Sequence, residues 1–173
     1  MGQAFVMENR TGAGTVVGTD VGHKAAPDGY TLVVGSLSNL AFNPALYTKL
    51  PYDVNDFTLL GIAASYSYTL VGRKDLPANN LRELIDLARA NPGKLTYVGA
   101  VGTGQQVAAM ALFKQTGVDV LAVPYKSNTA AYPDVIAGRV DLFFDNTQTI
   151  RPYLAQGVVK AFATSSIGRD PIV

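Results

Sequence analysis

The sequence predicts an α/β fold with a mostly parallel, doubly wound sheet. From residue 68 to residue 164, short apolar segments of strand length alternate with segments of helical periodicity. Hydrophobic residues make up 48% of the 173-residue chain and charged residues only 16%, a composition suited to burying surface in a layered core. Strands that alternate with helices at this spacing favour parallel pairing, because each helix returns the chain to the same edge of the sheet.

The second part of the chain has the clearest elements. Asn80 and Glu83, three residues apart, are typical of a capping box, and the apolar stripe that follows runs to the stop signal Asn91-Pro92-Gly93. Pro133 is expected to shorten or kink a later helix. Strands are expected at 68–71, 95–99, 120–123, 140–144 and 158–164, and further helices at 104–116, 128–137 and 147–156.

The first part of the chain predicts strands at 4–8 and 30–34, which flank a helix at 15–26 and a Pro27-Asp28-Gly29 turn. Short helical turns are expected around Pro44. The apolar segment 57–73 ends in β-favouring residues and is expected to cross between two lobes.

Composition and charge exclude several classes of function. The net charge is +1, with 14 basic and 13 acidic residues and no basic block, which argues against a nucleic-acid partner. The chain has no cysteine and one histidine, His23, so it cannot build a zinc site of the usual kind, and His23 is expected to be exposed. The charge-free run 57–72 is too short and too polar to cross a bilayer, and no secretory signal pattern opens the chain.

Polar side chains gather in the loops that follow the expected strands. Because ligands of α/β sheets bind at the carboxyl ends of the strands, these loops predict a hydrogen-bonding cradle for a small polar molecule. The residues concerned are Ser36, Ser38, Asn39, Thr103, Tyr125, Lys126, Ser127, Asn128, Asp145, Asn146, Thr147 and Gln148.

The glycine-rich joint at 99–104 is the most informative of these loops. It follows a strand and opens a helix, so it collects unpaired backbone N–H groups where the helix dipole is positive. Such a joint binds anions without basic side chains, and it predicts a small acid as ligand. The alternative is a turn that needs glycine only for its flexibility.

Two other features leave alternatives open. Asp145, at a strand end, is suited to act as a general base, but it is equally suited to cap the next helix or to orient a ligand group. Gly12-Ala13-Gly14 with Gly18 suggests a dinucleotide loop, but its spacing departs from G-x-G-x-x-G.

Short motifs along the whole chain give a resemblance to a known family. The chain resembles the Bug (TctC-type) solute-binding receptors of the tripartite tricarboxylate transporters over residues 6–166. The matching motifs are Val6-Met7-Glu8-Asn9-Arg10-Thr11-Gly12-Ala13-Gly14, Lys24-Ala25-Ala26-Pro27-Asp28-Gly29-Tyr30-Thr31-Leu32, Gly35-Ser36, Asn43-Pro44-Ala45-Leu46-Tyr47, Leu50-Pro51-Tyr52-Asp53, Leu84-Ile85, Asn91-Pro92-Gly93-Lys94-Leu95, Leu112-Phe113-Lys114, Val123-Pro124-Tyr125-Lys126, Gly138-Arg139-Val140-Asp141 and Phe144-Asp145.

This resemblance implies a periplasmic binding-protein-like fold, type II-like, with two doubly wound lobes joined by crossing strands and a small carboxylate enclosed between them. It implies a partial first lobe at 1–73, a second lobe at 74–160 and a return strand at 161–173. The chain starts past the family's first strand and helix, so the first lobe is expected to be incomplete. The ligand-binding residues that it implies are Ser36, Ser38, Gly102, Thr103, Gly104, Tyr125, Lys126 and Asp145.

The sequence departs from the family pattern at three positions. Ser127 stands where the family usually has glycine, and Val107 stands where histidine is common. Asn39 stands near a position that usually carries a hydroxyl side chain. By resemblance, the chain is expected to be a periplasmic, non-catalytic receptor without metal or cofactor that serves membrane transporter subunits. The incomplete first lobe is expected to drive homo-oligomer formation. The alternatives are an enzyme that acts on a small carboxylate in the same cleft, or a remnant that oligomerises and binds nothing.

Overall fold

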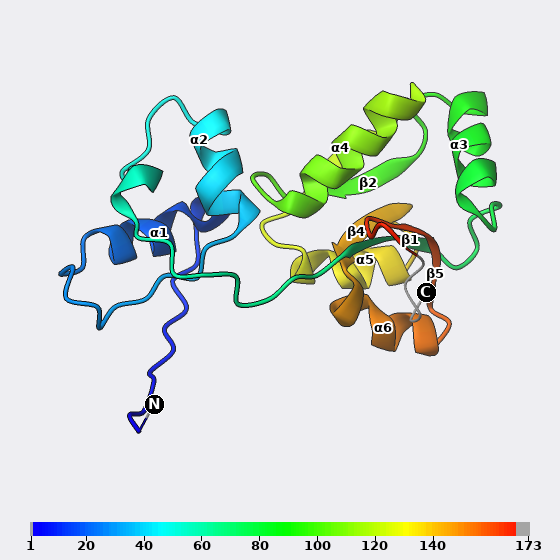
Figure 1. Ribbon diagram of the computed structural model, residues 1–173. Helices are drawn as coiled ribbons and strands as arrows, with labels where there is room; N and C mark the ends of the chain where they lie inside the picture. Colours follow the sequence, from blue (N-terminus) through cyan, green and yellow to red (C-terminus); the bar gives the residue numbers. More distant parts are fainter. Residues whose placement is uncertain (1, 169–173) are drawn as a thin grey trace. The chain divides into compact units, whose positions relative to one another are not determined.

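The chain folds into two compact units. The computed structural model describes residues 2–168 (Figure 1). One unit contains residues 2–61 with 102–104, and the other contains 62–101 with 105–168. The expected lobe boundary lay after residue 73, whereas the units divide after Gly61 because strand β1 (Tyr68–Arg73) belongs to the sheet of the second unit. Residues 169–173 of the expected return segment lie outside the described residues.

The second unit is built on a five-stranded sheet with the strand order β3-β2-β4-β1-β5. Strand β2 pairs in parallel with β3 and β4, and β1 runs antiparallel to β4 and β5. The α/β prediction is confirmed, but the mostly parallel pairing is corrected at β1. That strand lies between β4 and β5 and pairs antiparallel with both. The helix that connects β4 to β5 makes those two strands run in the same direction, but it does not fix the direction of the strand between them. The other strands are β2 (Thr96–Gly99), β3 (Leu121–Pro124), β4 (Leu142–Asn146) and β5 (Val159–Thr164).

The helices of this unit begin where local chemistry starts them. The Asn80 side chain accepts a hydrogen bond from the Glu83 N–H at 2.9 Å, and the Glu83 carboxylate accepts one from the Asn79 N–H at 2.7 Å, so the capping box is present. Pro133 follows the first residue of its helix, where no N–H is needed, and therefore starts the helix instead of kinking it. The helices are α3 (Leu81–Ala90), α4 (Gly104–Thr116), α5 (Tyr132–Ile136), preceded by the turn Thr129–Ala131, and α6 (Thr147–Ala155).

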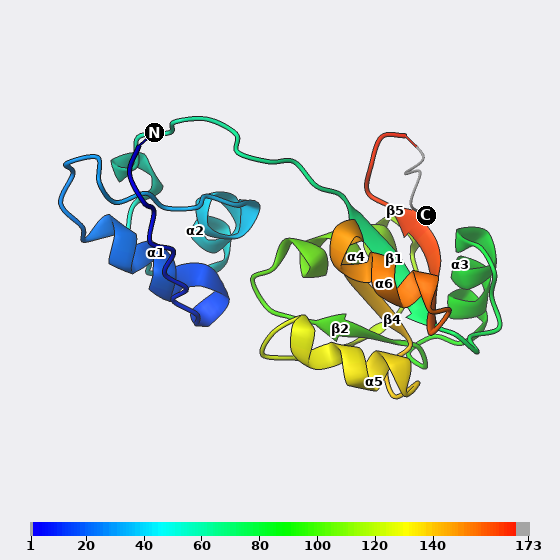
Figure 2. The same cartoon turned by 90° about the horizontal axis from the view of Figure 1, so that it is seen from below.

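Helices cover both faces of the sheet (Figures 1 and 2). Strand β4 shows the arrangement, because Leu142 and Phe144 pack with residues of α3 and α4, whereas Phe143 packs with residues of α5 and α6. Since successive side chains of a strand point to opposite faces, one short strand contributes to two cores. The residue that follows Phe144 is Asp145, which places a carboxylate on the α5 face of the sheet.

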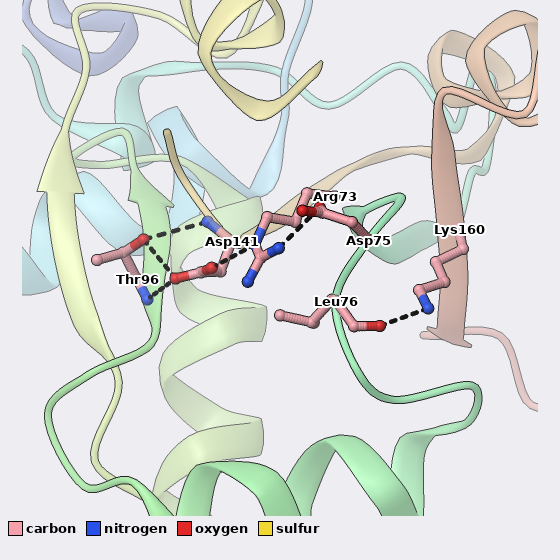
Figure 3. Close-up of polar contacts among 6 residues, drawn as sticks. All are labelled: Arg73, Asp75, Leu76, Thr96, Asp141 and Lys160. Atoms are coloured by element: carbon pink, nitrogen blue, oxygen red, sulfur yellow. Dashed lines mark hydrogen bonds and ion pairs between the residues drawn. The ribbon is translucent and has the colours of Figure 1, made fainter. Parts of the chain in front are cut away.

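Asp141 joins three strands at the opposite end of the sheet (Figure 3). Its Oδ1 accepts from Arg73 Nε at 2.8 Å, and its Oδ2 accepts from the Thr96 N–H at 2.8 Å and the Thr96 hydroxyl at 2.9 Å. Arg73 also pairs with Asp75 at 2.7 Å. The hydrogen bonds to the Asp141 and Asp75 carboxylates raise the pKa of Arg73. Nearby, Lys160 donates to the Leu76 carbonyl at 2.6 Å. Strands β2 and β4 share one registered pair, Tyr97 and Leu142, so Asp141 supplies side-chain bonds where the backbone ladder is short.

The first unit is held by short helices, and its described residues contain no β-strand. The strands expected at 4–8 and 30–34 are therefore corrected. Both segments lie outside the sheet and are largely exposed, at 91% for Val6 and 92% for Tyr30. A strand needs a ladder partner for its backbone groups, and all five described strands pair with one another in the second unit. The elements are Ala13–Thr15 (η1), Val16–His23 (α1), Ser38–Phe42 (η2), Asn43–Leu46 (α2) and Val54–Asp56 (η3).

Polar side chains form the interior of the first unit. The Asn43 amide donates to the Gly14 carbonyl at 2.9 Å and to Tyr52 Oη at 3.2 Å, and Tyr52 in turn donates to the Asn39 carbonyl at 2.9 Å. The turn held by Asn43 is strained, because Ala13 and Thr15 adopt positive φ angles of 46° and 78°. The residues buried in the 2–61 part of this unit are Thr19, Asn39, Asn43 and Tyr52.

The sequence predicted an exposed His23, and this prediction is corrected by the structure. Its side chain is 26% exposed, and its Nε2 lies 2.8 Å from a carboxylate oxygen of Asp56, which belongs to a turn 33 residues later. The ring also contacts Phe57. His23 therefore ties α1 to the turn at η3, a contact between segments distant in sequence.

Of the helices in the described part of the chain, none has both the length and the apolar character needed to cross a bilayer.

Candidate functional site

Asp145 is the centre of a polar cluster at the carboxyl end of β4. Its side chain is almost fully buried, with the residue 3% exposed. Oδ2 accepts from the Tyr132 hydroxyl at 2.7 Å. Oδ1 accepts from Gln105 Nε2 at 3.1 Å, from the Asn146 N–H at 2.8 Å and from Asn128 Nδ2 at a longer 3.4 Å. Burial of this carboxylate is compatible with folding because several donors replace water.

Tyr132 is locked in position as a donor to Asp145. Its ring stacks on Tyr153 with centroids 4.4 Å apart and meets Phe143 edge-on at 5.1 Å. Burial, reinforced by the hydrogen bond to Asp145 and its negative charge, raises the pKa of the Tyr132 phenol far above its usual range. The phenol therefore remains protonated and donates at all physiological pH values.

Hydroxyl groups surround the start of α6. The Thr147 hydroxyl lies 2.9 Å from Ser67 Oγ and 2.8 Å from Thr69 Oγ1, and the Thr147 N–H donates to the Ser67 carbonyl at 3.0 Å. A hollow of about 180 Å³ lies beside them, lined by Ser65, Tyr66, Ser67, Thr147 and Gln148. This hollow offers hydroxyls and an amide rather than charge, which suits a small polar molecule. A larger hollow of about 290 Å³ lies on α3, away from the strand ends, and is lined by Leu81, Arg82, Ile85, Asp86 and Arg89.

The glycine-rich joint has the predicted local structure. Strand β2 ends at Gly99 and α4 begins at Gly104, with Gly102 between them at a φ of 79°. Only glycine adopts that angle without strain. The first N–H groups of α4 therefore follow this turn directly, as an anion site at a helix N-terminus requires.

Tyr125 and Lys126 lie at the end of β3. The Tyr125 hydroxyl donates to Asp134 at 2.7 Å, and Arg139 pairs with the other oxygen of that carboxylate at 2.7 Å. The hydrogen bond from Tyr125 and the pairing with Arg139 lower the pKa of Asp134, while burial and the contact with Asp134 raise the pKa of Tyr125 to about 12. The Tyr125 hydroxyl is thus directed to α5, and Lys126 is exposed to solvent.

Ser36 and Ser38 belong to the first unit. The Ser36 N–H and hydroxyl both donate to Asn39 Oδ1, at 2.7 and 3.1 Å, and Asn39 Nδ2 donates to the Thr19 hydroxyl at 3.1 Å. Ser38 opens the short π-helix η2 and is half-buried. Asn39 therefore shapes the loop that carries Ser36.

The structure adds two residues to those that the sequence singled out. Gln105 and Tyr132 both bond to Asp145. Gln105 follows the glycine joint directly, and that position could have drawn attention to it. Tyr132 opens α5 and packs in a hydrophobic cluster, where a tyrosine is usually only a core residue. Within residues 2–168, no group of three or more His, Cys, Asp or Glu side chains is placed to hold a metal ion.

Comparison with known proteins identifies the family. The model of the tripartite tricarboxylate transporter family receptor, TctC, matches residues 1–172. The chain is 34% identical over 173 residues to a UPF0065 protein from the tcbD-tcbE intergenic region of Pseudomonas sp. (strain P51), and 31% identical over 173 residues to BugT of Bordetella pertussis. These alignments cover 99% and 98% of the chain, but 51% and 53% of the relatives.

Solved structures show the same fold. An adipate-bound protein of R. palustris superimposes with a TM-score of 0.90 at 32% identity, over 97% of this chain and 57% of its own. The malate-bound MatC of Rhodopseudomonas palustris gives 0.81 at 30% identity, over 92% and 55%. The chain thus has a periplasmic binding-protein-like fold and spans about half the length of the relatives that it matches. With a family match over almost its whole length and relatives above 30% identity, the chain belongs to the TctC family of tripartite tricarboxylate transporter receptors.

Proposed function

We propose that this chain is an extracytoplasmic solute-binding receptor, or part of one, that captures a small carboxylate for a tripartite tricarboxylate-type transporter. The observation that carries the proposal is the set of hydroxyl, amide and backbone N–H groups at the starts of α4 and α6, where the carboxyl ends of β2 and β4 lie. Hydrogen-bond donors in such places hold carboxylates without a basic side chain. The adipate and malate in the related structures support this class of ligand.

We propose specific contacts for the ligand. The backbone N–H groups of Gly102, Thr103 and Gly104 hold the carboxylate, and Ser36 and Ser38 contribute hydroxyls. Tyr125 and Lys126 follow the end of β3, the strand beside β2, and Lys126 supplies a positive charge for the anionic ligand. Asp145 completes the polar site through the Gln105 and Asn128 amides that donate to it.

In this role the chain acts in the periplasm, without catalysis and without a cofactor. Its partners are the membrane subunits of the transporter. The alternative, an enzyme acting on a carboxylate, would use Asp145 as general base. The contacts of Asp145 disfavour that role, because its carboxylate already accepts four hydrogen bonds from the protein.

The proposal predicts saturable binding of a small carboxylate. A ligand present at 100 times its dissociation constant is expected to stabilise the folded chain by about 2.7 kcal/mol. A thermal-shift screen over malate, succinate, adipate, citrate and amino acids, followed by calorimetric titration, measures this. Neutral sugars of similar size serve as controls. Stabilisation by sugars alone, or turnover of a bound acid, would contradict the receptor proposal.

We also propose that the chain forms a homo-oligomer through its first unit. The segments at 4–8 and 30–34 lie outside any strand and expose large apolar side chains, which are Phe5, Val6, Met7, Tyr30, Leu32 and Val34. Exposed apolar segments that lie outside a sheet can pair with a strand of another molecule. In a two-fold dimer the same segments of both copies would pack against each other. The net charge of +1 per chain adds little repulsion between the copies.

Multi-angle light scattering at low micromolar concentration is expected to give a dimer or a larger oligomer. The double substitution Tyr30→Lys with Val34→Lys should produce monomers, because two buried cations would face their own copies across the contact. Met110→Lys, at an exposed position of α4, is the matched control and should leave the oligomer intact. A wild-type chain that stays monomeric would refute this part of the proposal.

A further inference from the structure

The Asp145 carboxylate is occupied by the protein itself. Three donors converge on Oδ1, from Gln105, Asn128 and the Asn146 backbone, and Tyr132 donates to Oδ2. An ionised carboxylate offers about four acceptor positions. With the residue 3% exposed, little of this capacity faces a ligand.

The same bonds determine how two amide side chains are turned. Gln105 and Asn128 each direct the NH₂ group toward Asp145. The NH₂ and C=O groups of an amide diverge from the same carbon, so each carbonyl oxygen points in a different direction from the NH₂ group that faces the carboxylate. Gln105 and Asn128 are half-buried, whereas Asp145 is buried, so the amides are the more accessible members of the cluster.

We infer that Asp145 is a positioning residue that orients the Gln105 and Asn128 amides, and that these amides contact the ligand through outward-facing carbonyl oxygens. This inference rests on the proposed receptor function and extends it to the class of ligand. Carbonyl oxygens accept hydrogen bonds and repel other oxygens. The site therefore favours a carboxylate that also carries a donor, such as a hydroxyl or ammonium group, over the same acid without it.

Malate and succinate are the matched probes, because they differ only by one hydroxyl group. The wild-type chain is expected to bind malate about ten times more tightly than succinate in calorimetric titrations. In Asp145→Asn, the new NH₂ group opposes the amide donors and lets the amides reverse. The malate preference should fall to about one, while a purely structural defect would weaken both acids equally. A preserved tenfold preference in Asp145→Asn would overturn the inference.

A double-mutant cycle separates indirect from direct action. Asp145→Ala and Gln105→Ala should each weaken malate binding about tenfold, and the double variant should lose little more than either single variant, because both changes remove the same contact. Losses that multiply to about a hundredfold would show that Asp145 contacts malate independently. Asp86→Ala, which removes an exposed carboxylate from α3, is the control and should leave affinity unchanged.

A ligand-free measurement tests the positioning role on its own. The side-chain amide NMR resonances of Gln105 and Asn128 should shift in Asp145→Asn but not in Asp86→Ala. If neither acid binds the wild-type chain, the receptor proposal fails for these acids, and these resonances alone decide the positioning role. Unshifted resonances would overturn it.

Discussion

Replacing Asp141 with alanine is expected to lower the free energy of unfolding of the second unit by about 3 kcal/mol. The substitution removes the ion pair with Arg73 and both bonds to Thr96, and it leaves the Thr96 N–H without its acceptor. The Asp141 and Arg73 side chains are only 15% and 23% exposed, so water replaces these partners incompletely. For a unit of about this size, the loss corresponds to a drop in melting temperature of roughly 12 °C or more.

Asp75 provides a matched control, because it pairs with the same guanidinium at 2.7 Å but is 77% exposed (Figure 3). Water solvates both groups of an exposed ion pair and screens their attraction, so Asp75→Ala should scarcely change the melting temperature. Scanning calorimetry or chemical denaturation of both variants measures the difference. Equal effects of the two substitutions would mean that Asp141 does not join β1, β2 and β4 in the way its contacts indicate.

Replacing Asn43 with alanine is expected to disorder the first unit while the second unit keeps its stability. Asn43 is fully buried, and its amide holds the Gly14 carbonyl, the Thr15 hydroxyl at 3.3 Å and Tyr52 Oη. Each lost bond to a buried group costs about 1 kcal/mol or more. Little apolar burial offsets the loss, since Tyr52 is the one buried hydrophobic residue among those described in this unit. The strained turn at 13–15 would lose its support as well.

Hydrogen exchange resolved by mass spectrometry tests this expectation region by region. Peptides from residues 10–57 should exchange at least tenfold faster in Asn43→Ala, and those from β1 and β4 should not change. Asn55→Ala is the control, because the Asn55 amide bonds only to Asp53 at the surface. Slow exchange retained across 10–57 would show that other contacts hold the first unit.

Local signals were sufficient for the elements of the second unit. Asn80 with Glu83 starts α3, Gly99 and Gly104 bound the joint before α4, and apolar runs mark all five strands. These features act over a few residues, through capping, turn geometry and side-chain periodicity, so they can be read without knowing the fold. The family motifs likewise lie in short segments and were sufficient for the family.

Long-range contacts decided what the sequence could not. The segments at 4–8 and 30–34 have strand patterns but form no strand, because pairing depends on a partner elsewhere. The antiparallel direction of β1 depends on β4 and β5, which follow it by about 70 to 90 residues. The periodicity of β1 is the same in either direction, so the pattern could not predict it.

The candidate site divides in the same way. The sequence by itself determined that hydroxyls, amides and a glycine joint follow the strands, because the order of strand and loop is a local property. Only the tertiary structure decided which of them meet. Gln105 reaches Asp145 across 40 residues, whereas the Tyr125 hydroxyl bonds to Asp134 instead. A hydrogen bond requires atoms within about 3 Å of each other, and that proximity arises from packing of the helices against the sheet, which sequence spacing does not encode.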